Sequence, residues 1–178
     1  SSYEYWGRAA SLLTTTLDGT AHVPMMNETT RIYHMAASQH LASEFPPHQE
    51  NGQNVNNPND FSWLVRGLLV RMHEWVTDGT APPPSRYPLL DDETLVAPAD
   101  VNFPDIPDIN FPTSTHLAYP VDYGPRFASE GIIDNEPPIL GPAYTILVPQ
   151  VNEDGNEYSG LLTPGARIPL ATYTGWNL

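Results

Sequence analysis

Histidine is the side chain best suited to exchange a proton near neutral pH, and the chain contains six of them. His40 has the most informative setting. It follows residues 30–37, an apolar and β-favouring run that predicts a buried strand, and it precedes a polar loop that carries prolines. An imidazole on a loop that leaves a strand is well placed to act as a general base.

A helix is predicted over residues 60–77. Apolar side chains recur there at the spacing of one helical face, at Phe61, Leu64, Val65, Leu68, Leu69, Met72, Trp75 and Val76. Asn59 or Asp60 can cap the first amides, and Gly79 is placed to end the helix in a left-handed turn. We expect this helix to pack one side onto a sheet.

The succession of strand, histidine loop and closing helix is the order in which an α/β-hydrolase presents its general base. A matching nucleophile is not in this sequence, because no serine stands in Gly-x-Ser-x-Gly and cysteine is absent. We therefore expect the rear part of a hydrolase that acts on an ester or amide by acyl transfer. The serine would lie in a missing N-terminal half, and the chain by itself would be inactive.

The orienting acid comes before the histidine in this fold, at the end of an earlier strand. Glu4 fits that order, because it lies directly before Tyr5, where a strand would emerge. Its carboxylate would hold the imidazole tautomer and stabilise the imidazolium. Two alternatives stay open. Glu4 can belong to a helix and pair with Arg8, or Asp18 can be the acid, although Asp18 and the glycine after it predict a turn.

The other histidines are expected to have structural or surface positions. His34 lies within the predicted strand, where burial with one hydrogen bond is expected, and His73 lies in the middle of the predicted helix. His48 lies in a loop with two prolines, where solvent exposure is expected. The group His40, Glu44, His48 and Glu50 has metal-ligand residue types, but its spacing matches no common metal motif. We predict neither a metal nor a cofactor.

The organisation of the chain changes near residue 80. Sixteen of the twenty prolines lie at or beyond Pro82, which excludes long helices there. We expect residues 1–80 to form the last strand and closing helix of an α/β-hydrolase core. Residues 81–178 would be a proline-rich, mostly extended region that packs on the same domain. Asp154-Gly155 predicts a β-hairpin turn in that region.

Composition narrows the possible partners. The 178 residues include 21 acidic and 7 basic side chains, a formal net charge of −14, which argues against nucleic acid and anionic membranes as partners. The absence of cysteine excludes disulfides and thiolate metal sites. No apolar run is long enough to span a bilayer. The composition suits a secreted or periplasmic protein, and both ends of the sequence have the character of a chain cut from a longer one.

Several motifs occur in an order and spacing that resemble one known family. They are Glu4-Tyr5-Trp6-Gly7-Arg8, Arg31-Ile32-Tyr33, Gln39-His40, Asn57-Pro58-Asn59-Asp60, Pro83-Pro84-Ser85-Arg86-Tyr87-Pro88, Asp122-Tyr123-Gly124-Pro125-Arg126-Phe127, Val148-Pro149-Gln150-Val151 and Thr172-Tyr173-Thr174-Gly175-Trp176-Asn177. Nearly the whole chain resembles the C-terminal half of a bacterial family described as alpha/beta hydrolase domain-containing proteins. It departs from the family at Ser38 and Leu41, where threonine and glycine are usual.

The resemblance implies an α/β-hydrolase fold whose earlier half holds most of the parallel sheet and a nucleophile-elbow serine. It also implies a glutamate at position 4 and a proline-rich stretch within the same protein. A second class of function stays open: a non-catalytic, β-rich secreted module that binds partners through aromatic side chains. The aromatic residues concerned are Tyr87, Phe103, Phe111, Tyr119, Tyr123, Tyr144, Tyr158, Tyr173 and Trp176.

Overall fold

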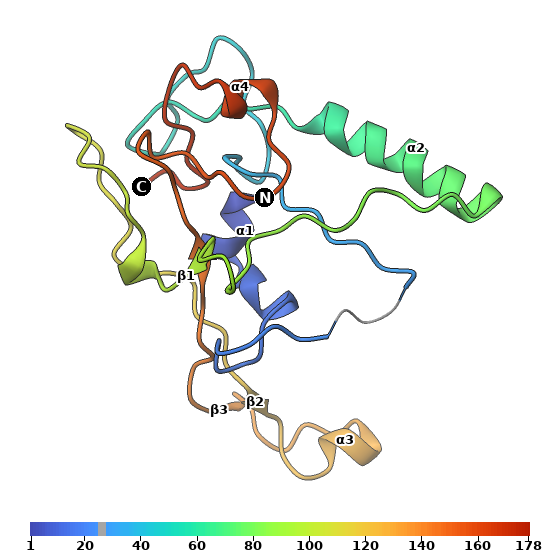
Figure 1. The fold of residues 1–178 in the computed structure, drawn as a ribbon. Coiled ribbons are helices and arrows are strands. Elements are labelled where there is room, and N and C mark those ends of the chain that lie inside the picture. The colour runs from blue at the N-terminus through green and yellow to red at the C-terminus, as the bar shows by residue number, and fades with distance from the viewer. Residues whose placement is uncertain (25–27) are drawn as a thin grey trace.

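The computed structural model describes residues 1–24 and 28–178, and Figure 1 shows their course. The elements follow in the order α1 (Ser2–Gly7), the 3-10 helix η1 (Ala10–Leu13), α2 (Ser62–Asp78), β1 (Leu95–Val96), the 3-10 helix η2 (Pro98–Asp100), β2 (Val121–Asp122), α3 (Phe127–Glu130), β3 (Ile139–Leu140), β4 (Val148–Pro149) and α4 (Pro164–Arg167). Each of these strands is two residues long. After residue 81 the helices are short, as expected where prolines remove backbone donors.

The strands form two antiparallel pairs and no larger sheet within the described residues. In the first pair Leu95 lies opposite Pro149 and Val96 opposite Val148. In the second pair β2 lies beside β3. Helix α1 packs against β4. The buried apolar core around this contact comprises Tyr5, Trp6, Leu95, Leu147 and Val148.

An aromatic cluster extends this core. The rings of Phe103 and Phe111 are stacked with centroids 5.1 Å apart, and Trp176 meets them edge-on at 5.4 and 6.0 Å. Trp6 contacts Phe111 edge-on at 5.4 Å. Phe103, Phe111 and Trp176 were candidates for an external binding surface. The three rings are half-buried, and their packing against one another extends the core.

The predicted strand over residues 30–37 is wrong. Only Tyr33 and Met35 make β-type contacts, as single parallel bridges to two separate segments. No strand of more than two residues occurs in the described chain, so the segment has no ladder to join. The burial expected of this segment is confirmed at its end, since residues 34–38 are all buried.

The predicted helix over residues 60–77 is confirmed as α2 (Ser62–Asp78), with Phe61 and not Asn59 or Asp60 at the N-cap position and with the predicted end at Gly79. A carboxylate oxygen of Asp60 accepts a hydrogen bond from the Ser62 amide at 2.7 Å, and Gly79 ends the helix with φ at 72°. The expected packing onto a sheet is not found in the described residues. None of the α2 residues is buried, and the helix projects from the rest of the chain (Figure 1). No described helix has the length and apolar character needed to cross a membrane.

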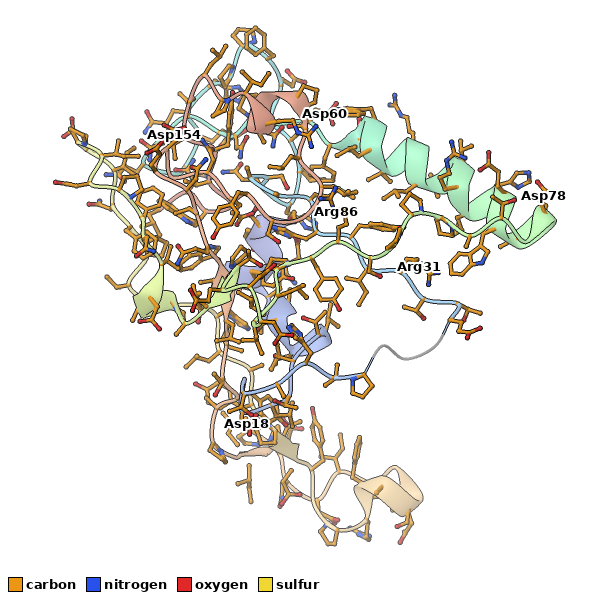
Figure 2. The ribbon with its side chains drawn as sticks, in the orientation of Figure 1. Asp18, Arg31, Asp60, Asp78, Arg86 and Asp154 are labelled. Carbon is orange, nitrogen blue, oxygen red and sulfur yellow. The ribbon has the colours of Figure 1, made fainter. Side chains whose placement is uncertain are left out.

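The predicted turn at Asp154-Gly155 is present. Gly155 has φ at 73°, and Val151 pairs antiparallel with Glu157 across the turn. Figure 2 shows Asp154 at the tip of this hairpin, at the surface. The returning arm carries Glu157 into the interior, where only 5% of its surface is exposed. The hairpin thus places the Glu157 carboxylate against Ala37, in the segment that leads to His40.

Candidate active site

The structure brings Glu4 and His40 together, although 36 residues separate them in the sequence. Glu4 lies in the first turn of α1, and His40 lies on the loop that follows the buried residues 34–38. The Glu4 Oε1 atom is 2.5 Å from the His40 Nδ1 atom. The side chain of His40 is 66% exposed and that of Glu4 is 28% exposed. The imidazole is therefore accessible to a second molecule or chain segment.

Glu4 is held in its ionised form. Burial raises the pKa of its carboxyl, whereas hydrogen bonds from the Ser1 hydroxyl and His40 stabilise the ionised form and lower the pKa. An ionised carboxylate only accepts hydrogen bonds, so Nδ1 of His40 carries the proton. In the neutral imidazole Nε2 is then the basic nitrogen, and no described residue is hydrogen-bonded to it.

The local setting of Glu4 differs from the prediction. It lies in a helix and not at the end of a strand, because no neighbouring strand is available to pair with residues 2–7. Although Glu4 lies in a helix, its carboxylate does not pair with the Arg8 side chain. The Arg8 amide donates to the Glu4 carbonyl at 3.0 Å, as in any helix, while the Arg8 guanidinium lies 6.0 Å from the centre of the Tyr3 ring.

Asp18, the competing acid, belongs to a turn. Its Oδ1 accepts hydrogen bonds from the Thr16 hydroxyl at 2.6 Å, the Thr20 hydroxyl at 2.8 Å and the Thr20 amide at 3.1 Å, and these bonds lower the pKa of Asp18. Asp18 lies well away from the start of α1 (Figures 1 and 2), and the carbonyl of Leu17 beside it accepts a hydrogen bond from the Thr145 amide. The predicted turn is confirmed, and Asp18 does not contact His40.

Ser2 and Ser38 fix α1 against the histidine loop. The Ser38 amide donates to Ser2 Oγ at 3.1 Å, and the Tyr3 amide donates to the Ser38 carbonyl at 3.3 Å. Both serines are fully buried, and the Ser38 hydroxyl donates to the Met35 carbonyl at 2.6 Å. Leu41, the other departure from the family pattern, is 75% exposed. The carboxylate and the imidazole are thus positioned by main-chain contacts close to each of them.

Ala37 turns the chain toward the histidine. Its φ is 54°, a left-handed conformation that costs an L-residue about 1 kcal/mol or more. The Ala37 amide donates to Glu157 Oε2 at 2.9 Å, and the Ala37 carbonyl accepts from Asn57 Nδ2 at 3.0 Å and Asn59 Nδ2 at 2.8 Å. Asn59 also accepts a hydrogen bond from the Thr163 hydroxyl. All five residues are buried, so loss of any partner leaves a buried polar group unsatisfied.

A second histidine–glutamate pair lies in the interior. The His34 Nε2 atom is 2.8 Å from Glu157 Oε2, and the two side chains are 1% and 6% exposed. The Ser2 hydroxyl donates to the same oxygen at 2.5 Å. Burial raises the pKa of Glu157, but the charge and hydrogen bond of His34, with the bonds from Ser2 and Ala37, outweigh burial and hold the pKa below its usual range. His34 Nδ1 is buried without a hydrogen-bond partner in the described residues.

The two pairs differ in the ring nitrogen that meets the acid. In a Ser-His-Asp triad the acid accepts from Nδ1, and Nε2 faces the nucleophile. His40 has this arrangement, and its side chain is accessible. His34 has the reverse arrangement and is buried, as expected for a histidine that holds the interior together. The geometry therefore distinguishes an accessible imidazole, whose Nδ1 contacts the acid, from a buried one that supports the loop.

The remaining positions show no metal site. His48 Nε2 is 3.3 Å from Glu50 Oε1, and both side chains are more than half exposed, as predicted for His48. His73 is exposed on α2. The described residues contain no group of three or more histidine, aspartate or glutamate side chains that could hold a metal ion.

Glu157, Asn57 and Asn59 support the site, and sequence reasoning does not identify them. Glu157 lies 120 residues from the amide that it accepts, and Asn57 lies 20 residues from the carbonyl to which it donates. Contacts of a side chain with a distant backbone group leave no periodic or local pattern. The one signal is indirect, since Asn57 and Asn59 belong to a motif of the resemblance and Glu157 follows a predicted turn.

The chain belongs to the alpha/beta hydrolase domain family. The family model described as "Alpha/beta hydrolase domain" matches residues 15–178, which include His40 and Glu157 and begin after Glu4. No curated protein and no solved structure matches the chain. The resemblance drawn from the motifs is thus confirmed at the level of the family. The short helices and strands are consistent with part of an α/β fold, and the family indicates a hydrolase-type enzyme.

Two alanine-to-glycine substitutions test the left-handed turn. Ala36 and Ala37 are both buried, but only Ala37 has a positive φ. We expect Ala36→Gly to lower the free energy of unfolding by about 1 kcal/mol, because glycine adds backbone entropy to the unfolded chain. Ala37→Gly should change it by less than about 0.5 kcal/mol, since release of left-handed strain offsets that loss. Urea unfolding of both variants measures the difference, and equal losses would contradict the assigned turn.

The buried carboxylate predicts a pH dependence of stability. The pKa of Glu157 is lower in the folded chain than its usual value of 4.5, so its charge stabilises the fold above that pH. This contribution is lost as the pH falls from 4.5 toward the folded-state pKa. Glu157→Gln should therefore be less stable at neutral pH and should lose less stability on acidification. Glu153→Gln, exposed on the same hairpin, is the matched control. Parallel pH profiles of Tm for the Glu157→Gln variant and the original chain would refute this.

Proposed function

We propose that this chain supplies the general base and the orienting acid of a serine-type hydrolase that acts on an ester or amide by acyl transfer. His40 is the base and Glu4 is the acid. The observation that carries this proposal is the 2.5 Å contact of Glu4 Oε1 with His40 Nδ1, which leaves Nε2 of an accessible imidazole for the nucleophile. Membership of the alpha/beta hydrolase domain family supports the same class of reaction.

In this mechanism His40 Nε2 removes the proton of a serine hydroxyl while the serine Oγ attacks the substrate carbonyl. The imidazolium that forms lies against the Glu4 carboxylate, which stabilises its charge and keeps the ring oriented. The proton then passes from Nε2 to the leaving group as the C–O or C–N bond breaks. Water next gives a proton to His40 and attacks the acyl-serine ester. His40 returns that proton to the serine Oγ as the acyl–oxygen bond breaks, which releases the acid product and restores the serine.

The serine comes from outside this sequence in our proposal. No serine here stands in Gly-x-Ser-x-Gly, and Ser1, which contacts the pair, donates its hydroxyl to Glu4 and not to His40. An N-terminal half of the same protein would carry the serine, the oxyanion donors and the parallel sheet. The exposed apolar face of α2 suits it for packing on that sheet. It borders a groove of 650 Å³ lined by Val65, Leu68, Leu69, Met72 and Trp75.

The histidine is tested in the full-length hydrolase on an activated ester. His40→Ala should lower kcat by roughly a thousandfold or more, which leaves the rate given by binding and the oxyanion hole. His48→Ala is the matched control, because His48 is also exposed and also contacts a glutamate. Its kcat should stay within about twofold of the original enzyme. Similar losses at the two positions would sink the assignment of His40.

The acid is tested by a second matched pair. Glu4→Gln should keep the fold and the KM but lower kcat by roughly a hundredfold to ten-thousandfold, because an amide can favour the wrong imidazole tautomer and does not stabilise the imidazolium. Glu50→Gln removes the carboxylate beside His48 and should leave kcat unchanged. Thermal unfolding checks that both variants fold. A folded Glu4→Gln enzyme with full kcat would show that Glu4 is structural.

A further inference from the structure

A pocket of 420 Å³ lies beside the histidine loop. Residues 45–58 supply one part of its lining and residues 170–177 another, and Gln39 and Ile109 complete it. Hydrogen bonds join the two segments: the Asn54 amide donates to Asn177 Oδ1, and Asn177 Nδ2 donates to the Asn54 carbonyl, both at 2.9 Å. The volume falls within the roughly 300–1,000 Å³ of small-molecule sites, so the pocket is large enough for a substrate group.

The pocket is uncharged in a strongly acidic chain. None of its described lining residues is an acid, an arginine or a histidine, although the chain carries 21 acidic and 7 basic residues. A larger cavity, 1520 Å³ in volume, is different, since Glu28, Arg31, Arg86 and Asp92 all line it. A charged ligand group would lose its hydration in the uncharged pocket and find no ionic partner. Its chemistry therefore selects a neutral ligand.

Apolar side chains around the pocket are left in contact with solvent. Phe45 is 85% exposed, Val55 55% and Leu170 96%, and all three line the pocket. Covering these side chains with an apolar ligand group would remove their surface from water, which is favourable. Side-chain amides of Gln39 and Asn56 also line the pocket and can bond to a neutral carbonyl or hydroxyl group.

The pocket is joined to the candidate active site by shared residues. Gln39 lines the pocket and directly precedes His40. Asn57, another lining residue, donates from Nδ2 to the Ala37 carbonyl and also to the Thr174 carbonyl, both at 3.0 Å. One buried amide therefore holds the histidine loop and the C-terminal wall of the pocket. A group bound in the pocket lies next to the loop that presents the imidazole.

We propose that this pocket binds the uncharged, apolar acyl group of an ester substrate and discriminates against carboxylate-bearing groups. Its role in turnover rests on the function proposed above. The binding of a neutral ligand in the pocket does not rest on that function, because neither His40 nor Glu4 lines the pocket. The proposal is therefore tested first by binding and then by turnover.

The binding test uses 1-hexanol and hexanoate, which share a chain length and differ in charge. The readout is the indole N–H resonance of Trp176, a lining residue, assigned by its loss in Trp176→Phe. Titration of hexanol into the full-length protein should shift this resonance and saturate, and hexanoate at neutral pH should bind at least about tenfold more weakly. Val55→Asp should weaken hexanol binding about tenfold, whereas Val121→Asp, a similarly exposed valine on β2, should not. Equal binding of the two probes, or equal effects of the two variants, would overturn the proposal.

The turnover test separates this proposal from the proposed function. His40→Ala should keep the hexanol response of Trp176 while it loses hydrolysis. In the full-length hydrolase, Val55→Asp should raise KM for p-nitrophenyl hexanoate and leave kcat and KM for p-nitrophenyl acetate unchanged. A KM that rises equally for both esters overturns the pocket assignment even if His40 is the base. Retained activity in His40→Ala together with the hexanol response overturns the catalytic assignment alone.

Discussion

The left-handed turn at Ala37 is the constraint on which the candidate active site depends. An L-residue does not adopt this conformation without a cost, and the cost is offset by hydrogen bonds to both sides of its backbone. Glu157 takes the amide, and Asn57 and Asn59 bond to the carbonyl. All three partners lie far from Ala37 in the sequence. The direction in which the chain leaves toward His40 is thus fixed by side chains and not by a strand.

The same solution recurs elsewhere, because the described residues contain few backbone ladders. Buried backbone groups need partners, and amide side chains supply them where strands do not. Asn156, fully buried, donates to the carbonyl of residue 171 at 3.1 Å and accepts the amide of residue 173 at 2.7 Å. Gln150 bonds in the same two-sided way to residues 100 and 102. Asparagine and glutamine act here as short cross-links between irregular segments, which explains why so many polar residues are buried without charge partners.

Local features of the sequence predicted what local forces determine. The spacing of apolar residues predicted α2. A glycine predicted each of two turns, and both glycines have a positive φ. The order of residues along the chain pointed to His40 and Glu4 as neighbours, and the two side chains are 2.5 Å apart. The strand over residues 30–37 failed because a strand needs a partner, and β propensity says nothing about whether one is present. The expected strand end at Glu4 failed for the same reason, and Glu4 lies in helix α1 instead. The supports of Ala37 are contacts across 20 to 120 residues, which only folding brings together.

Histidine and glutamate meet twice in this chain, and the difference between the two pairs is one of tautomer and exposure. At His34 the acid meets Nε2 inside the protein, and that acid also holds the Ser2 hydroxyl and the Ala37 amide. Loss of the His34 contact would disturb the position of Glu157, and with it the bonds from Ser2 and the Ala37 amide. At His40 the acid meets Nδ1 at the surface, where little else depends on the imidazole. The interior pair is therefore part of the support of the loop, whereas the surface pair is accessible, as the chemistry proposed for it requires.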